Sequence, residues 1–357
     1  MIRLKFLLFF CCAVFVACLC VVPAPAFSAE EVDSGPVSYR GKSKRMKSMP
    51  DWPNNIQFLS GPTGGQWFQL GENIARLLNK EIIPTSSRLG GGLSNLINVN
   101  NKTGDVGFSV TSFLHCADVG LPEFAGVNVD NISIIGEMYP QLYYFIVRED
   151  FARKHNLHTV RDLLNLKTPG SMASLRPGSA SYFVVSLLLK YGYQTGFEQL
   201  KDIGWRLSYG NFTVLTDEFV SGDIDALVFT AGKDISLVHS IVEYVPVRFL
   251  PIDANVVELF AKDFGMFPHP IPKTSYKKMN EDIMTLGDNT NIIIRRDLPD
   301  ELAFAITRIA HEYRHVIGAD ISDFLDWKPA LSSRFAHFLH PGAKKYWQTL
   351  SAEDKKE

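Results

Sequence analysis

The sequence predicts an α/β protein with two lobes that face a common cleft. Strand-like and helix-like segments alternate from Ile56 onward, a pattern typical of largely parallel sheets covered by helices. The chain has 357 residues, of which 46% are hydrophobic and 21% charged, so each of two lobes can bury a core. Glycine-rich turns separate several expected strands from the helices that follow them, which is where α/β proteins bind ligands.

Charge is balanced along the chain. Lys and Arg total 36, and Asp and Glu total 38. The composition therefore provides no general attraction to nucleic acid or to anionic lipid. Any selectivity for anions must come from local groups.

The N-terminus has the order of a secretory signal peptide. The basic start Met-Ile-Arg-Leu-Lys is followed by an apolar stretch at 6–22 and by small residues at 23–29. We expect residues 1–28 to direct export and to be cleaved after Ala26 or Ser28. An uncleaved membrane anchor is the alternative, because the apolar stretch is near the lower length limit for spanning a bilayer.

Cysteine usage agrees with this interpretation. Four of the five cysteines lie within the expected signal peptide. Cleavage leaves Cys116 alone and excludes an internal disulfide. A lipid anchor on Cys18 is an alternative, although the residues before it make a poor lipoprotein signal. We expect Cys116 to be a buried, small apolar side chain rather than a reactive thiol.

The first half of the globular region alternates strands and helices. A strand at 56–60 is followed by a glycine-rich turn and by a helix whose apolar residues between Trp67 and Ile82 share one face. A second, shorter helix begins near Leu93. The remaining strands expected in this half are 105–110, 132–135 and 143–147.

The second half repeats the alternation. A strand at 171–175 leads through a turn to a long helix that ends at Gly192. Another helix ends at Gly222, before a buried strand at 224–229. The remaining expected elements are a helix capped by Thr159, a proline-rich loop at 268–272, a strand at 291–295 and a helix at 297–316.

These elements divide the chain into four parts. Residues 29–51 are polar and lack periodicity, so we expect a flexible leader there. Residues 246–251 are expected to return the chain from the second lobe to the first. The expected organisation is a signal peptide at 1–28, a leader at 29–51, a first lobe at 52–139 plus 252–357, and a second lobe at 140–251.

Three turns rich in glycine and serine, at 61–66, 87–92 and 176–181, connect a strand to a helix. Glycine lets the backbone approach a ligand, and a helix N-terminus presents unpaired N–H groups. Three such turns facing one cleft would hold carboxylates, and Arg88 and Arg176 are the nearest cations. Tight turns, ordinary helix caps and surface arginines are the alternative. The glycine spacing fits neither the phosphate-binding loop nor the dinucleotide fingerprint.

Taken in order, these segments resemble the TAXI family of solute-binding proteins, the extracytoplasmic subunits of one class of tripartite ATP-independent periplasmic (TRAP) transporters. The resemblance runs from about Ile56 to Trp347. Its marks are Thr63-Gly64-Gly65-Gln66-Trp67-Phe68, Gly91 to Leu96, Gly104-Asp105-Val106-Gly107-Phe108, Asp162-Leu163, Pro177-Gly178-Ser179, Gly222-Asp223-Ile224-Asp225-Ala226 and His340-Pro341-Gly342-Ala343 with Tyr346.

The resemblance implies a type II periplasmic-binding-protein fold, in which two lobes close about a hinge near 139–140 and 246–251. The implied ligand is glutamate, glutamine or a related dicarboxylate such as 2-oxoglutarate, handed in the periplasm to the TRAP membrane subunits. Neither catalysis nor a cofactor, metal or nucleic acid is expected, and a sensor that reports to a receptor is an alternative role. The ligand-binding residues expected, with Phe68 lining the cleft and Arg88 added as a cation, are Gly65, Gln66, Trp67, Phe68, Arg88, Gly91, Gly92, Asn95, Ser179, Ser181, Thr230 and Gly232.

The chain departs from the family pattern at several positions. Gly92 stands where serine is expected, and Ala180 and Ser181 alter a Gly-Ser-Gly-Thr pattern. The sequence lacks the acid expected near Ser112, and Lys233 replaces a proline. Fewer acids and an added lysine favour a ligand more anionic than an amino acid zwitterion.

A zinc metallohydrolase is the alternative function. His311-Glu312-Tyr313-Arg314-His315 matches H-E-x-x-H, which on a helix provides two zinc ligands and a general base. A catalytic zinc needs a third protein ligand, but the longer protease pattern has Ile321 at that position. We therefore favour a surface helix whose polar face carries His311, Glu312 and His315.

Overall fold

The computed structural model describes residues 49–63, 65–233, 235–318 and 335–353. The expected signal peptide and most of the expected leader lie outside these residues. Within the described ranges, no helix has the length and apolar character needed to cross a membrane.

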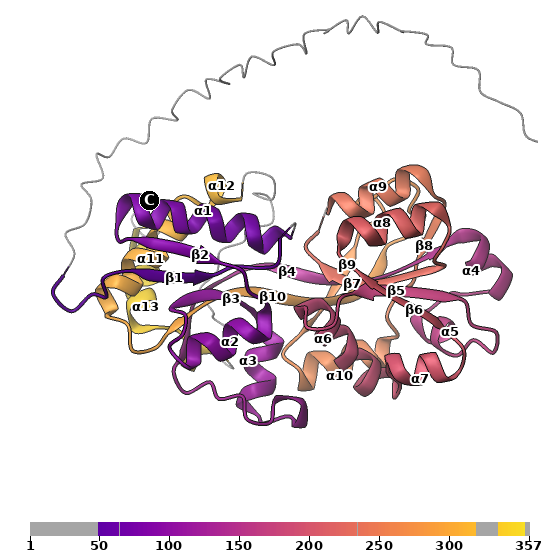
Figure 1. Cartoon of the computed structure of the whole chain (residues 1–357), viewed down its shortest axis with the longest axis horizontal. Coiled ribbons are helices and arrows are strands. Elements are labelled where there is room, and N and C mark those ends of the chain that lie inside the picture. The colour runs from indigo at the N-terminus through magenta and orange to yellow at the C-terminus, as the bar shows by residue number, and fades with distance from the viewer. Residues whose placement is uncertain (1–48, 64, 234, 319–334, 354–357) are drawn as a thin grey trace, which may run out of the picture. The chain divides into compact units, whose positions relative to one another are not determined.

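One ten-stranded sheet runs through the described chain in the order β2-β1-β3-β10-β4-β7-β5-β6, with β8 paired to β4 and β9 paired to β10. We call the half built on β1 to β3 the first lobe and the half built on β5 to β7 the second lobe (Figure 1). The predicted α/β fold with two lobes is therefore confirmed.

The first lobe has three parallel strands with helices on both sides. The strands are β1 (Ile56–Leu59), β2 (Thr85–Arg88) and β3 (Val106–Val110). Helix α1 (Gln66–Glu81) lies on one side, and α2 (Gly92–Asn100) and α3 (Thr111–Asp118) lie on the other (Figure 1). The apolar face predicted for α1 is buried from Trp67 to Leu78, so its spacing fixed its orientation on the sheet.

Two long antiparallel strands, β4 (Ile132–Arg148) and β10 (Ile283–Arg295), pass through both lobes. Near Gly136 they pair with each other, whereas the end of β4 pairs with β7 (Ala226–Ala231). The two separate strands predicted at 132–135 and 143–147 are thus one strand. Pro140 lies between the two predicted strands. In the structure it lies opposite Asn289, where the pairing is irregular and a missing N–H is tolerated.

The second lobe repeats the parallel arrangement. Its other parallel strands are β5 (Ser171–Leu175) and β6 (Arg206–Gly210), next to β7. Its helices are α4 (Glu149–His155), α5 (Val160–Leu164), α6 (Ala180–Leu187) with its π-helical continuation η2 (Leu188–Gly192), α7 (Phe197–Asp202), α8 (Phe212–Ser221) and α9 (Ser236–Tyr244). The predicted end signals hold: Thr159 forms a capping box with Asp162, and Gly222 ends α8 in the left-handed conformation at φ 90°.

The segment between β7 and β10 also pairs with the long strands. β8 (Val247–Phe249) joins the end of β4, and β9 (Phe267–Ile271) joins the start of β10, with α10 (Ala254–Asp263) between them. The proline-rich loop predicted at 268–272 is therefore wrong over most of its length. Because β9 pairs on one side only, its prolines fall on an edge strand, where a missing N–H is tolerated.

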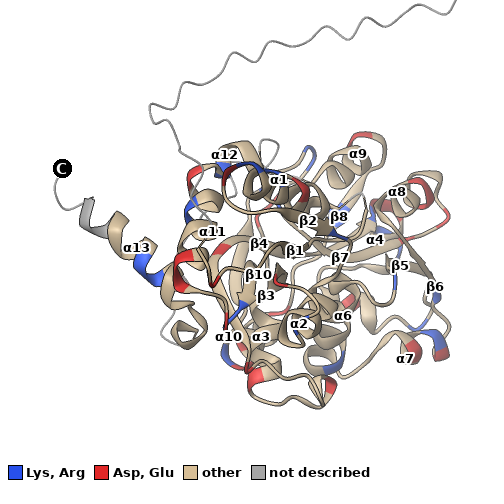
Figure 2. Cartoon of the chain, turned by 60° about the vertical axis from the view of Figure 1, so that its left-hand side comes forward, with Lys and Arg blue, Asp and Glu red and all other residues tan. Residues whose placement is uncertain are grey.

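The C-terminal part packs against the first lobe. It comprises α11 (Asp300–Glu312), α12 (Arg314–Ile317), η4 (Ala336–Phe338) and α13 (Pro341–Glu353). The single helix predicted at 297–316 is interrupted at Tyr313. Figure 2 shows acidic and basic residues interspersed on this side, for example on α1, in agreement with the balanced composition.

The lobes touch each other along the side that carries α3 and α6. Phe113 and Phe124 of the first lobe meet Phe183 of α6, with ring centroids 5.2 and 5.3 Å apart. Glu123, in the short helix η1 (Pro122–Phe124), forms an ion pair with Lys190 and accepts a hydrogen bond from Tyr191 at 2.7 Å. The π-helical turn η2 supplies both of these partners.

Asn95 ties the first lobe together. Its side-chain amide donates to the carbonyl oxygens of Leu59, Ser60 and Phe108 at 2.9–3.1 Å. Its Oδ1 accepts from the Gly91 N–H at 3.0 Å, and the side chain is fully buried. One residue of α2 therefore joins the ends of β1 and β3 to the turn before α2.

Replacing Asn95 should destabilise the fold, because Asn95→Ala leaves several buried polar groups unpaired. Each such group costs about 1–3 kcal/mol, so we expect a loss of at least about 3 kcal/mol. Urea unfolding measures this loss, with Ser94→Ala as the control, since Ser94 is exposed and makes one hydrogen bond on the same helix. Equal stability of the two variants would contradict the role given to Asn95.

Candidate functional site

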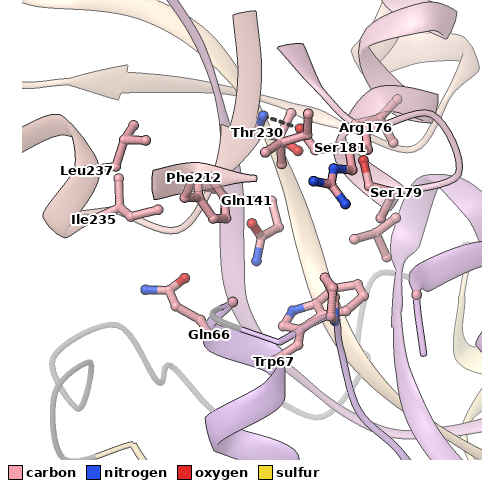
Figure 3. Close-up of a pocket in the computed structure, with 18 of the residues that line it drawn as sticks. Gln66, Trp67, Gln141, Arg176, Ser179, Ser181, Phe212, Thr230, Ile235 and Leu237 are labelled. Carbon is pink, nitrogen blue, oxygen red and sulfur yellow. Dashed lines mark hydrogen bonds between the residues drawn. The ribbon is translucent and has the colours of Figure 1, made fainter. Parts of the chain in front are cut away.

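A cavity of about 670 Å³ lies where the two lobes meet. Its lining comes mainly from residues at or just after the carboxyl ends of the parallel strands, the edge at which α/β sheets bind ligands. Figure 3 shows α1, β4, the turn before α6 and the start of α9 around it. All three glycine-rich turns named from the sequence contribute to the lining.

The structure brings together seven of the twelve predicted site residues. Those that line the cavity are Gly65, Gln66, Trp67, Gly91, Ser179, Ser181 and Thr230. Those that do not are Phe68, Arg88, Gly92, Asn95 and Gly232. All three predicted turns therefore reach the cavity, but individual residues named with them do not line it.

Each outlying residue has a structural reason for its position. Arg88 is exposed at the end of β2, and Phe68 lies one position along α1 from Trp67. A Cβ on Gly92 would lie 2.8 Å from the Phe113 ring, so this glycine allows a close contact. Gly232 is equally confined, because a Cβ there would lie 2.7 Å from Gln66 Oε1.

The turn before α6, the start of α6 and the end of β7 form a polar end of the cavity, made of Arg176, Ser179, Ser181 and Thr230 (Figure 3). Ser179 caps α6 by accepting from the Tyr182 N–H at 3.1 Å. Ser181 Oγ accepts from the Thr230 N–H at 2.7 Å and so fixes the turn to β7. Arg176 is the one cation among the described lining residues, and it stands beside the positive end of the α6 dipole.

A second polar group lies where β4 pairs with β10. Trp67 Nε1 donates to Thr290 Oγ1 at 3.3 Å, and Gln141 Nε2 donates to the same oxygen at 3.0 Å. Trp67 and Gln141 both line the cavity. Sequence reasoning missed Gln141 because the predicted strand was divided at Pro140. Only this proline suggested a break, and that was the one available indication that the strand is continuous.

Asp288 is the most unexpected lining residue. It lies on β10 and is 1% exposed, and its carboxylate accepts from Ser112 N at 3.0 Å and from Ser112 Oγ at 2.5 Å. Burial raises the pKa of Asp288 to about 7 against the opposing effect of these hydrogen bonds, and nearby Glu137 raises it further. The sequence has no acid beside Ser112, but β10 brings one there from a distant part of the chain.

Apolar side chains complete the lining and could not be recognised from the sequence as site residues. They include Val110, Leu175, Val184, Phe212, Ile235 and Leu237. Each also has the pattern of an ordinary core residue. Only the folded arrangement of the two lobes distinguishes their cavity-facing role.

The H-E-x-x-H segment packs against the C-terminal helix. His311 Nδ1 lies 2.8 Å from the Tyr346 hydroxyl, and burial lowers the pKa of His311 to about 4, with Arg314 and His315 adding to the effect. The helix breaks between the two histidines, and His315 is exposed. Ile321 lies outside the described residues, within which no three His, Cys, Asp or Glu side chains gather as a metal site.

The Cys116 side chain is fully buried, as predicted, and burial raises the pKa of its thiol to about 12. The nearby charges of Asp288 and Glu123 act in the same direction. A thiol that holds its proton so firmly is a poor nucleophile.

Asp288 should make stability fall as the pH rises. Its carboxyl ordinarily titrates near 3.8 and in the folded protein near 7, so between these values the folded chain holds a proton that the unfolded chain has lost. The stabilisation that this proton provides is complete below about pH 4 and is lost by about pH 7. Between these values the free energy of unfolding falls by up to about 1.4 kcal/mol per pH unit. Unfolding free energies of wild type and Asp288→Asn, measured from pH 4 to 8, should diverge in favour of the variant. Parallel pH profiles would contradict this assignment.

Similarity to one solved structure supports the fold. MatC from Rhodopseudomonas palustris with bound malate has a TM-score of 0.50, with 15% identity over 84% of this chain and 98% of that chain. The periplasmic binding protein BugD gives a TM-score of 0.47, with 12% identity over 86% and 98% of the two chains. A TctC solute-binding protein from Polaromonas gives 0.45, with 14% identity over 85% and 100%.

Sequence comparison identifies a family. A search of curated proteins finds no match, but a search against family models does. The NMT1-like family matches residues 58–349, which cover both lobes and most of the described chain. Because this match spans well over half of its length, the chain belongs to the NMT1-like family.

Proposed function

We propose that this protein is the extracytoplasmic solute-binding subunit of a TRAP transporter of the TAXI class. It captures a small carboxylate, such as glutamate, glutamine or a dicarboxylate like 2-oxoglutarate, in the cavity between its lobes. It then delivers the ligand to the membrane permease. Residues 1–28 direct the chain to the periplasm in this proposal.

The polar end of the cavity is the observation that carries the proposal. Arg176 provides a guanidinium with the fork geometry that a carboxylate accepts, and the start of α6 adds positive partial charge. Within the described chain, the Arg176 guanidinium forms no ion pair that would compete with a ligand. Ser179 and Ser181 supply neutral hydroxyl groups at the same end.

Ligand binding would act through a hinge in β4 and β10. We propose that bending occurs near Gln141 of β4 and Asn289 of β10, where the pairing of the two strands is irregular. On this view the second lobe extends to the start of β10, beyond the boundary at 251 expected from the sequence. Opening would separate Phe183 from Phe113. A ligand that contacts both lobes would stabilise the closed form, because these contacts are lost when the lobes separate.

The charge of the ligand is open to a direct test. Asp288 places an acid next to Ser112. The lack of an acid beside Ser112 in the sequence therefore no longer favours a ligand more anionic than an amino acid. MatC was solved with malate, a dicarboxylate of the class proposed here. Titrating glutamate and 2-oxoglutarate in parallel would decide between a zwitterion and a dianion.

Arg176→Gln should weaken binding of whichever carboxylate the protein takes by about 10- to 100-fold, because a hydrogen bond to a charged group contributes about 1.5–3 kcal/mol. Isothermal titration calorimetry measures the loss. Arg206→Gln is the matched control, since Arg206 of β6 is exposed, as Arg176 is, but does not line the cavity. Unchanged affinity in Arg176→Gln, with a normal melting temperature, would count against the proposed site.

A further inference from the structure

We infer that the natural ligand is an amphipathic carboxylate, with an aliphatic or aromatic group opposite its carboxylate. This inference rests on the proposed capture of a carboxylate at Arg176, and it revises the ligand examples given with that proposal. It favours such compounds over glutamate, glutamine and compact dicarboxylates. The argument comes from the distribution of side chains around the cavity.

The cavity has an apolar end, made of Phe212, Ile235 and Leu237. Figure 3 shows these three side chains on one side, across Gln141 from Arg176 and Ser179. All three belong to the second lobe, at the starts of α8 and α9. A ligand whose carboxylate meets Arg176 would therefore direct its other end toward hydrocarbon.

The apolar end is held in place by packing. The Phe212 ring meets Phe229 edge-on at 6.0 Å, and Phe229 stacks on Tyr144 at 5.2 Å. Ile235 and Leu237 are 8% and 5% exposed, within the core of the second lobe. Because these side chains are packed in place, they cannot easily rotate aside to give a polar group of the ligand access to water.

Among the described lining residues, no cation lies at this end to pair with a second ligand charge. The polar lining groups nearby are Gln66 and Ser236, which are both neutral. Asp288 lies among the other lining residues and would repel an anion when ionised. Burying a carboxylate without a cation is unfavourable, so the distal carboxylate of 2-oxoglutarate or glutamate is disfavoured there.

Cavity size agrees with a larger ligand. A volume of about 670 Å³ falls within the range of roughly 300–1,000 Å³ found for sites that enclose drug-sized molecules. A compact dicarboxylate held at Arg176 would leave the half-buried Phe212 ring facing water. Contact between this ring and a hydrocarbon group would remove that apolar surface from water.

Two matched pairs of ligands test the inference on the wild-type protein. 4-Methyl-2-oxopentanoate shares the 2-oxo acid group of 2-oxoglutarate, and leucine shares the amino acid group of glutamate, but each has a branched hydrocarbon in place of the distal carboxylate. Calorimetric titration should give at least ten-fold tighter binding for the apolar member of at least one pair. Tighter binding of the dicarboxylate in both pairs would overturn the inference and leave the proposed function standing.

Variants locate the apolar contact. Phe212→Ala should reduce the preference for the apolar ligand several-fold, whereas Val214→Ala, an exposed position on the same helix that does not line the cavity, should leave it unchanged. An unchanged preference in Phe212→Ala would overturn the placement of the hydrocarbon group. Failure of all four compounds to bind would overturn both this inference and the proposed carboxylate function.

Discussion

The pairing of β4 with β10 is the constraint on which the rest of this structure depends. The two strands run antiparallel, and each continues beyond the pairing into the second lobe, where β4 meets β7 and β10 meets β9. Each lobe adds its own parallel strands to this pair. The carboxyl ends of both sets of strands consequently face a shared space, and the cavity is the result of this geometry rather than of any single loop.

The same strands bring distant groups into one site. Asp288 of β10 reaches Ser112, and Thr290 joins Trp67 of α1 to Gln141 of β4. The second lobe contributes the polar end at Arg176 and the apolar end at Phe212. Under the proposed function, the one local cation would bind the carboxylate of the ligand. Shape and hydrophobic contact would select the rest of the ligand.

Sequence reasoning recovered the parts of this arrangement that local chemistry determines. Apolar spacing located α1, the Thr159 cap began α5, and glycine-rich turns marked three walls of the cavity. It did not recover what depends on long-range pairing. Pro140 concealed a continuous strand, the prolines of β9 concealed an edge strand, and Asp288 had no local signal that linked it to Ser112. Asn95 lies in α2, just after a cavity-lining turn, yet its amide is used by backbone groups of Leu59, Ser60, Phe108 and Gly91.

The central claim is that the space between the lobes holds a small carboxylate through Arg176. Native mass spectrometry of the purified protein, with gentle desolvation, tests this claim most directly because it weighs any bound small molecule and any metal in one spectrum. The account predicts a bound carboxylic acid in wild type whose occupancy falls in Arg176→Gln. Equal occupancy of the same molecule in Arg176→Gln, or stoichiometric zinc that is lost from His311→Ala, would contradict it.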